Sequence, residues 1–239
     1  MDKALRSDYL EAMGIQSWVR RGLQDEHAPP GRALPVSSGV AGPRPVESLD
    51  WAELQSCVAN CTGCELHQAR TRTVFGTGNR QADWMIIGEA PGADEDRQGE
   101  PFVGRAGQLL TEMLRATGQQ RQDVYITNIL KCRPPQNRDP RPEEVASCHA
   151  YLQRQIALVR PSLILAVGRI AAHNLLETDV PVGRLRGRVH HYGGERIPLI
   201  VTYHPAYLLR LPLEKRKSWE DLRLALQVSG TLQREPPGP

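Results

Sequence analysis

The sequence lacks long apolar runs, a strong net charge and any sign of a cleaved leader. No apolar run approaches the roughly 20 residues that a membrane-spanning helix needs, so no membrane span is predicted. Apolar residues among the first 21 positions are spaced rather than continuous, unlike those of a secretory signal, and we therefore expect a cytoplasmic protein. A net charge of +3 is too small to indicate nucleic-acid binding by itself.

Internal repeats, heptads and the common nucleotide-binding motifs are missing as well. The glycine loop at 88–92 lacks the Gly-Lys-Ser/Thr ending of a P-loop, and its glycines are wrongly spaced for a dinucleotide fingerprint. With 239 residues, the chain has room for one substantial domain with appendages. We expect an amphipathic helix at 1–23 that docks on this domain or recruits a protein partner, a flexible Pro/Gly/Ala-rich linker at 24–48, the main domain at 49–228 and a disordered tail at 229–239.

Short apolar runs of strand length alternate with helical patterns along the main domain. The expected strands are 84–87, 124–130, 162–168 and 197–203, and helices are expected to begin near Gly104, Pro142 and Arg169. Strands separated by helices imply a largely parallel sheet with helices on both faces. We therefore predict an α/β fold, a three-layer α/β/α sandwich around a short central sheet, preceded by the amino-terminal helix and the linker.

Polar residues follow the expected strands and should meet at one edge of the sheet. The strand ends deliver Glu89, Asn128 and His204 to the edge where α/β proteins bind their ligands. Glycines on both sides of Glu89 allow backbone N–H groups to approach a ligand closely. The amide of Asn128 offers a donor and an acceptor together, which suits the edge of a nucleobase. A lone His before a Pro is more often a turn residue than a catalyst, and a lone Asn at a strand end has the same weakness, so the prediction of a site depends on their convergence.

Five cysteines, an odd number in a reducing compartment, indicate metal or redox chemistry before disulfides. Cys61 and Cys64 have metal-site spacing, and Cys132 and Cys148 form a distant pair beside polar turn residues. Four thiolates suit zinc or an iron–sulfur cluster, and spacing does not separate the two. Cys57, Cys61 and Cys64 also match the radical S-adenosylmethionine motif, but too little chain follows for the barrel it requires. Cys57 is therefore expected to be a small buried residue of a helix at 51–69.

Four segments, in this order and with the four-cysteine spacing, closely resemble the iron–sulfur uracil-DNA glycosylases called family 4. They are GEAPGADEDRQGEPFVGRAGQLL, YITNILKCRPP, AVGRIAA and VTYHPAYLLR, and the resemblance runs from Trp51 to about Leu226. It implies a structural [4Fe–4S] cluster held by Cys61, Cys64, Cys132 and Cys148. It also implies a hydrolase of base excision repair that flips uracil out of DNA, cuts its N-glycosidic bond and leaves an abasic site. We expect a cytoplasmic monomer, nucleoid-associated when it is on uracil-containing DNA.

The resemblance also implies roles for individual residues at the base. Phe102 would stack on the flipped base, and Asn128 would accept from uracil N3–H and donate to O4, a pattern that cytosine reverses. Glu95 would exclude thymine by blocking its methyl group. His204 and the backbone N–H groups of the Gly88–Ala90 loop would stabilise negative charge at uracil O2.

Water activation and DNA contacts complete the expected site. Related proteins often carry an Asp where this chain has Ala90, so Glu89 is the expected group to orient water or balance the sugar cation. Leu208 or Leu209 would fill the space left by the flipped base, although for either leucine alone a place in the core of the following helix is the stronger expectation. Arg210 and Arg186, within a basic stretch at 184–188, would contact phosphates, as would the cations at 215–217.

Two alternatives to a glycosylase that turns over remain. Some relatives bind uracil-DNA covalently through an inserted basic loop that ends in a His after the third cysteine. The corresponding segment here, RPPQNRDPRPEE, has no His, so turnover is expected. The second alternative is a non-catalytic iron–sulfur module that binds uracil-DNA or other damage and works through the amino-terminal helix.

Overall fold

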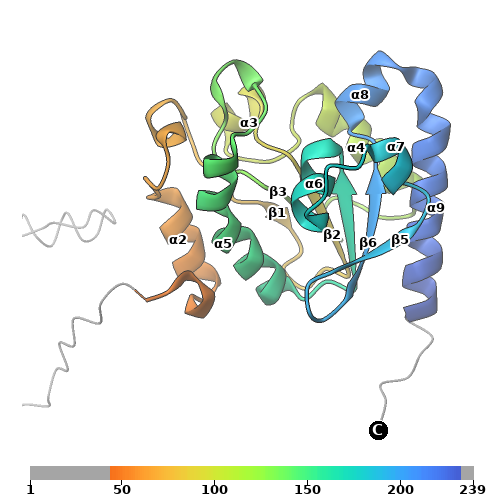
Figure 1. The fold of residues 1–239 in the computed structure, drawn as a ribbon, viewed down its shortest axis with the longest axis horizontal. Coiled ribbons are helices and arrows are strands. Elements are labelled where there is room, and N and C mark those ends of the chain that lie inside the picture. Colours follow the sequence, from red (N-terminus) through yellow and green to blue (C-terminus); the bar gives the residue numbers. More distant parts are fainter. Residues whose placement is uncertain (1–43, 233–239) are drawn as a thin grey trace, which may run out of the picture. The chain divides into compact units, whose positions relative to one another are not determined.

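The structure, a computed structural model, describes residues 44–232. The helix expected at 1–23, most of the linker expected at 24–48 and the last seven residues of the chain lie outside the described residues. The described part is built on a six-stranded sheet of order β1-β3-β2-β4-β6-β5 (Figure 1). Its four central strands are mutually parallel and the two edge strands are antiparallel. The strands are β1 (Thr77–Gly78), β2 (Trp84–Gly88), β3 (Tyr125–Asn128), β4 (Leu163–Val167), β5 (Val189–Tyr192) and β6 (Ile197–Thr202).

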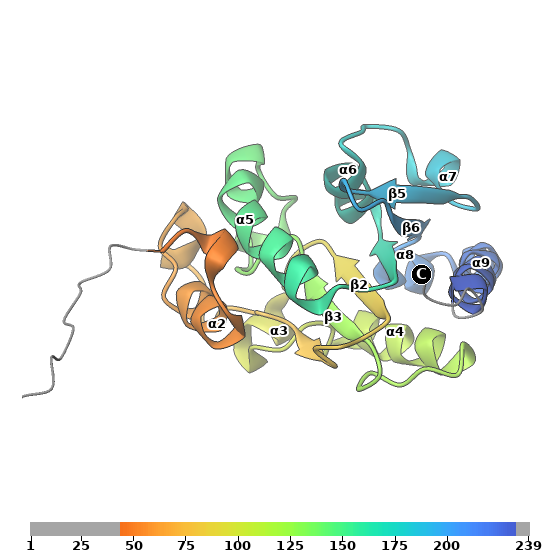
Figure 2. The same cartoon turned by 90° about the horizontal axis from the view of Figure 1, so that it is seen from below.

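Side chains of the central strands alternate between two apolar layers. In β2, Met85 and Ile87 join the layer covered by α5 (Pro142–Val159) and α6 (Arg169–Leu176). Trp84 and Ile86 join the layer covered by α4 (Arg105–Ala116), α8 (Pro205–Arg210) and α9 (Lys215–Leu232). Because successive side chains of a strand point to opposite faces, burial on both faces explains why these strands are almost wholly apolar. The predicted three-layer α/β/α sandwich is confirmed, and Figure 2 shows helices on both sides of the sheet.

The helix expected over 51–69 is shorter than predicted. A capping box between Asp50 and Glu53 starts α2 (Trp51–Ala59), and Asn60 ends it by donating from its backbone and its side chain to the carbonyl of Ser56. Asparagine at this position satisfies a helix-end carbonyl. Residues 61–64 are therefore a loop, followed by the short 3₁₀ helix η2 (Glu65–Gln68). The prediction of one helix through position 69 is wrong.

Both ends of the packed domain extend beyond the predicted bounds. The 3₁₀ helix η1 (Val46–Ser48) precedes α2, and Val46 packs against the apolar group around Leu49. At the other end, α9 continues to Leu232, and buried Ser229 accepts a hydrogen bond of 2.6 Å from the indole N–H of Trp84. A buried indole needs an acceptor, and Ser229 supplies it. The disordered tail expected from 229 is therefore wrong for its first four residues.

The carboxyl ends of the parallel strands meet where the order of the sheet reverses. From β2 the chain proceeds to β3 on one side and then to β4 on the other, which makes the β2–β4 boundary the switch point where α/β proteins bind ligands. The connections at this edge carry α3 (Ala93–Gln98), η3 (Pro135–Asn137) and η4 (Pro212–Glu214), while α7 (Val182–Leu185) lies before β5. Among the described helices, none has the length and apolar character to cross a membrane.

Candidate active site

A wide cavity of about 790 Å³ opens at the switch-point edge. It is lined from four loops that follow four different strands, by Glu89, Ala90, Gly92, Glu95, Phe102, Asn128, Asp139, Gly168, Arg169, His204 and Arg210 among others. The structure thus brings together the three strand-end residues whose convergence the sequence predicted. A cavity of this size with a few convergent polar groups is typical of a small-molecule or base-binding site.

Asn128 is the most deeply buried polar group of this cavity. It ends β3, is 1% exposed, and its Oδ1 atom is buried without a hydrogen-bond partner in the described part of the chain. A Cβ atom at Gly88 would lie 2.5 Å from Oδ1 of Asn128 and 2.6 Å from the ring of Phe102, so only glycine leaves room for both side chains. A buried acceptor without a partner is energetically costly. Oδ1 is therefore a candidate acceptor for a hydrogen-bond donor of a ligand.

Phe102 is held in a conformation that few residues adopt. Its φ angle is +55°, in the left-handed region. Arg121 secures this turn by donating to the carbonyl oxygens of Phe102 at 3.1 Å and Pro101 at 2.8 Å. The ring faces that of His204, with centroids 5.6 Å apart and planes inclined by 29°. Phe102 is thus positioned as a flat wall of the cavity.

Glu95, on α3, closes the same loop from the other side. Its carboxylate accepts hydrogen bonds from the backbone N–H groups of Gly92 at 3.1 Å, Val103 at 2.9 Å and Gly104 at 3.1 Å. A carboxylate with three backbone donors has little freedom to move, because any rotation leaves donors unpaired. The side chain predicted as a steric wall is therefore anchored where it lines the cavity.

His204 is poised as a neutral hydrogen-bond donor. It caps α8, and its Nδ1 accepts from the backbone N–H of Ala206 at 3.1 Å, so the proton of the neutral ring resides on Nε2. Burial, with a smaller contribution from Arg210 and against the opposing charge of Glu95, lowers the pKa of His204 to about 4. The imidazole is therefore uncharged near neutral pH.

Glu89 and Ala90 follow β2 directly. Burial raises the pKa of Glu89, Asp139 raises it further and Arg169 opposes the rise. Asp139 and Arg169 form an ion pair of 2.5 Å, and both line the cavity. Ala90 also lines the cavity and packs against the apolar group formed by Leu66, Leu130, Cys132 and Cys148, and its side chain has no polar atom that could bind water. Arg169 was not predicted, although it follows the end of β4 as Glu89 follows β2.

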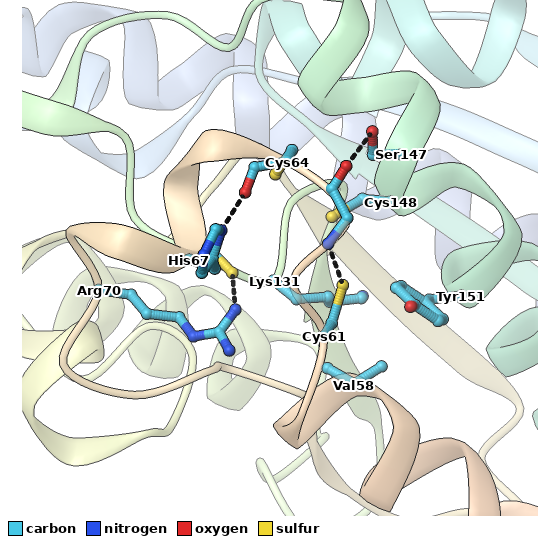
Figure 3. A pocket seen from close by; sticks show the side chains of 11 residues that line it. Val58, Cys61, Cys64, His67, Arg70, Lys131, Ser147, Cys148 and Tyr151 are labelled. Carbon is cyan, nitrogen blue, oxygen red and sulfur yellow. Dashed lines mark hydrogen bonds between the residues drawn. The ribbon is translucent and has the colours of Figure 1, made fainter.

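A second, narrow cavity of about 10 Å³ is lined by all four predicted cysteines, Cys61, Cys64, Cys132 and Cys148 (Figure 3). The backbone N–H of Gly63 donates to Sγ of Cys61 at 3.4 Å, and Arg70 donates to Sγ of Cys132 at 3.1 Å. Within residues 44–232, no three His, Cys, Asp or Glu side chains form a group able to hold one metal ion. The thiols instead line the wall of a cavity.

The chemistry of this donor set fits an iron–sulfur cluster. Such a cluster takes one thiolate at each of its irons, so its ligands line a cavity, and N–H donors to sulfur stabilise it. Burial raises the pKa of Cys148 to about 11, so its thiolate forms near neutral pH only with compensating positive charge. Cys57 does not line the cavity; it is half-buried in α2, with its Sγ 3.9 Å from the hydroxyl of Tyr151.

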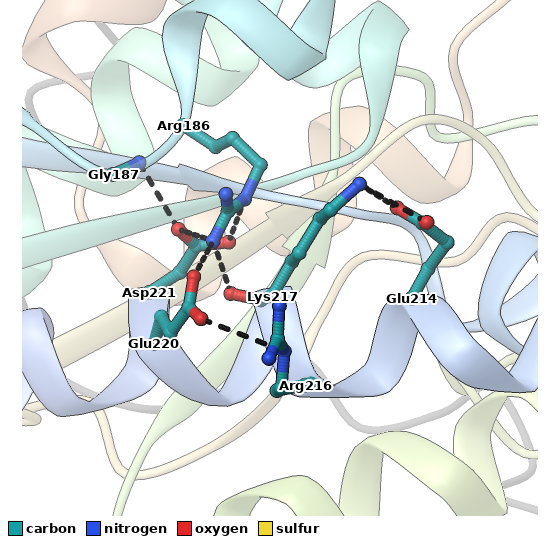
Figure 4. Close-up of polar contacts among 7 residues, drawn as sticks. All are labelled: Arg186, Gly187, Glu214, Arg216, Lys217, Glu220 and Asp221. Atoms are coloured by element: carbon teal, nitrogen blue, oxygen red, sulfur yellow. Dashed lines mark hydrogen bonds and ion pairs between the residues drawn. The ribbon is translucent and has the colours of Figure 1, made fainter.

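Two residues predicted to contact DNA are engaged elsewhere. Leu208 is 1% exposed and belongs to the core beneath α8, so its prediction as a wedge is wrong. Arg186 donates to the fully buried Asp221 and also contacts Glu220 and the carbonyl of Lys217 (Figure 4). A buried carboxylate requires a cation, so Arg186 stays with Asp221 and its prediction as a phosphate ligand is wrong.

The other predicted DNA contacts are accessible. Leu209 is 36% exposed, and exposed Arg210 lines the wide cavity. Sequence reasoning did not single out Leu211 and Leu213, which are 49% and 91% exposed in the turn between α8 and α9. That turn lies at the same edge as the carboxyl ends of the parallel strands (Figure 1). The signal in the sequence was the proline of Leu-Pro-Leu, which cannot continue α8 and leaves the two leucines outside the packed face of that helix.

Comparison with known proteins agrees with this geometry. The family model described as the uracil DNA glycosylase superfamily matches residues 75–223. The chain is 44% identical over 194 residues to the type-4 uracil-DNA glycosylase of Archaeoglobus fulgidus, covering 79% of this chain and 96% of that protein. It is 43% identical over 192 residues to that of Pyrobaculum aerophilum, covering 78% and 97%. Against the type-4 enzyme of Thermotoga maritima the identity is 47% over 155 residues, covering 64% and 80%.

Proposed function

The chain belongs to the uracil DNA glycosylase superfamily and to its type-4 members, and from this premise we propose that it excises uracil from DNA by hydrolysing the N-glycosidic bond. The product is an abasic site, the starting point of base excision repair. The observation that carries the proposal is the unpartnered Oδ1 of Asn128, buried in a cavity that it shares with Phe102 and His204.

Selection of uracil over cytosine is assigned to Asn128. Its Oδ1 would accept from N3–H of uracil and its amide nitrogen would donate to O4, so the buried acceptor gains its partner from a base that carries N3–H and not from cytosine. Cytosine carries an acceptor at N3 and a donor at N4. Its N3 would face the acceptor Oδ1 of Asn128, and its amino group would face the donor Nδ2. Because unpaired buried polar groups are costly, the reversed pattern is rejected strongly.

Selection of uracil over thymine is assigned to Glu95. The two bases share one hydrogen-bonding edge, so only the 5-methyl group distinguishes them. The carboxylate of Glu95 is anchored by three backbone N–H groups and cannot swing away from an added methyl. The flipped base would lie against the ring of Phe102, whose turn Arg121 holds in place.

Bond cleavage requires negative charge to leave with the base. Water adds to C1′ of the sugar while the bonding pair of C1′–N1 departs with uracil, and the proton that the water loses ends on the released base. The charge that develops on O2 is stabilised by aimed donors. His204 offers Nε2–H in its neutral form, together with the backbone N–H groups of the loop from Gly88 to Ala90. We assign to Glu89, which lines the cavity beside Ala90, the role of orienting the water or balancing the sugar cation, because Ala90 has no polar side chain.

A [4Fe–4S] cluster is proposed in the narrow cavity, held by Cys61, Cys64, Cys132 and Cys148. When bound, it would fasten the loop after α2, the segment after β3 and helix α5 to one another, with no part in bond cleavage. Visible absorbance and iron content of anaerobically purified protein test this assignment, and zinc without iron would contradict it. Cys57→Ser is the matched control, because this thiol lies outside the cavity and its loss should leave the iron content unchanged.

DNA binding is proposed at the rim of the wide cavity. Arg210 would contact a phosphate there, and an exposed leucine, Leu209 or one in the turn after α8, would occupy the space left by the flipped base. We propose that it acts as a monomer. We place it in the cytoplasm, on the nucleoid when it is bound to DNA.

The decisive experiment is incubation with an oligonucleotide that contains a single uracil, followed by alkali. Strand scission at the uracil is expected, with none in the matched thymine or cytosine oligonucleotide. A binding protein without glycosylase activity gives no scission and overturns the proposal. Scission that survives both Asn128→Ala and His204→Ala undiminished would leave the function standing and refute the assignment of the site.

A further inference from the structure

Lys131 is a buried cation whose partners are all neutral oxygens. It is 1% exposed, and among the described residues its ammonium group forms no ion pair with a carboxylate. Nζ instead donates to Oγ1 of Thr127 at 2.8 Å, to the backbone carbonyl of Asn128 at 2.7 Å and to Oε1 of Gln155 at 2.7 Å. A lysine ammonium has three donors, and all three are used. Burying a lysine amine is costly unless its donors are paired, and here the three hydrogen bonds provide that pairing.

These three bonds join β3 to α5. Thr127 and Asn128 are the last two residues of β3, and Gln155 lies in the middle of α5. Gln155 extends the network by donating to the carbonyl of Phe75 at 2.8 Å and to the hydroxyl of Tyr125 at 3.2 Å. The end of β3 is therefore held by side-chain bonds in addition to the sheet ladder.

Lys131 also connects the two cavities. It lines the narrow cysteine cavity (Figure 3), and Cys132 follows it in the chain. Its ammonium group meanwhile bonds the carbonyl of Asn128, whose side chain lines the wide cavity.

We infer that Lys131 is a positioning residue, which fixes the end of β3 so that the carboxamide of Asn128 stays aligned with the edge of uracil. This inference rests on the proposed function. Its consequence is selective: loss of the ammonium releases the backbone of Asn128 and weakens recognition of the base, whereas contacts to sugar and phosphate keep their geometry. A displacement of about 1 Å in a positioned group costs up to about a hundredfold in rate.

The test compares Lys131→Met with Arg133→Met. Both variants lose a cation next to Cys132, but Arg133 bonds the side chain of Asn137 at 2.8 Å and not Asn128. Binding is measured by fluorescence anisotropy to two oligonucleotides, one with 2′-fluoro-2′-deoxyuridine, which resists cleavage, and one with a tetrahydrofuran abasic analogue. We expect Lys131→Met to weaken binding of the uracil oligonucleotide about tenfold and that of the abasic oligonucleotide less than twofold. Arg133→Met should change both by equal, small factors.

A double-mutant cycle separates positioning from a general structural role. In the Asn128→Ala background, Lys131→Met should cause no further loss of uracil binding, because there is no carboxamide left to align. An equal loss in both backgrounds, equal weakening of both oligonucleotides, or unchanged uracil binding would each overturn the inference. Iron content and visible absorbance are recorded for every variant.

A second variant covers the case in which Lys131→Met does not accumulate as folded, iron-containing protein. Gln155→Leu removes one acceptor of the ammonium from α5, away from the cysteines, and should weaken uracil binding about threefold with the same selectivity. Absence of that selectivity counts against the inference. If the wild-type protein neither cleaves uracil-DNA nor prefers the fluorouridine oligonucleotide over the abasic one, the proposed function fails instead.

Discussion

The two cavities on either side of Lys131 differ in size and in how their polar atoms are satisfied. The wide one, about 790 Å³, contains Oδ1 of Asn128 without a partner and a histidine whose neutral donor faces no protein acceptor in the hydrogen bonds of the described residues. The narrow one, about 10 Å³, has N–H donors already directed at Cys61 and Cys132. A site that binds and releases a substrate has polar groups without partners in the free protein. A site for a permanent cluster already has hydrogen bonds to the side chains that hold it.

The difference predicts that damage to the wide cavity removes activity without removing the cluster. His204→Ala should lower the single-turnover rate about 10²–10³-fold, because one aimed donor to uracil O2 is lost. Binding to the abasic oligonucleotide and the iron content should remain at wild-type levels. A loss of less than fivefold would show that His204 is not the donor.

The neutral state of His204 also makes stability depend on pH. Its folded pKa of about 4 lies below the ordinary value of 6.5, so between these values the unfolded chain binds a proton that the folded protein does not. This contribution to stability is full above pH 6.5 and is lost as the pH falls toward 4, by at most about 3 kcal/mol from the size of the shift. Urea unfolding at pH 7 and 4.5 should show a larger decrease for wild type than for His204→Gln, which keeps an acceptor. Equal decreases in the free energy of unfolding for the two proteins would refute the assignment of this pH dependence to His204.

A pair of glycine substitutions compares the two cavities directly. A Cβ at Gly88 would lie 2.5 Å from Asn128 Oδ1, whereas a Cβ at Gly63 would lie at an ordinary 3.6 Å from Cys61 Sγ. Gly88→Ala should therefore lower kcat/KM for uracil-DNA by at least tenfold and destabilise the fold by about 1–3 kcal/mol, as overpacking does. Gly63→Ala should change activity and iron content less than twofold. The reverse ranking would mean that the narrow cavity is the less tolerant one.

The smallest effect is expected at the rim of the wide cavity. Leu213, which is 91% exposed, should be dispensable for folding, so Leu213→Ala should leave urea unfolding unchanged. It should slow excision from duplex DNA a few-fold while leaving single-stranded DNA unaffected, because only a duplex presents a gap to fill. Leu226→Ala, on α9 and 36% exposed, is the matched control. If Leu213→Ala changed the rate by the same factor relative to wild type on both substrates, this residue would be excluded as the wedge.

The residues at the strand ends could be predicted more successfully than the roles of individual surface residues in DNA binding. The four apolar runs give strands at nearly their expected positions, and their carboxyl ends bring Glu89, Asn128 and His204 to one cavity. Side-chain roles on α8 could not be read in the same way. Leu208 and Leu209 are adjacent leucines in sequence, yet one is in the core and the other is exposed. Lys131 follows Ile129 and Leu130 but precedes Cys132 and Arg133, and this mixed segment gave no local signal that the lysine is buried.

By itself the sequence determined the four parallel strands, the layers and the four thiols, because apolar periodicity and cysteine spacing are local properties of the chain, whereas the edge strands β1 and β5 were not predicted. Only the tertiary structure decided that Arg186 belongs to Asp221, that Leu208 faces the core and that Lys131 bonds the backbone of Asn128. The physical reason is that a buried charge or apolar side chain takes the partner that folding places beside it. For these residues that partner comes from another element of the fold, or from a neighbouring turn whose shape only the packed structure sets.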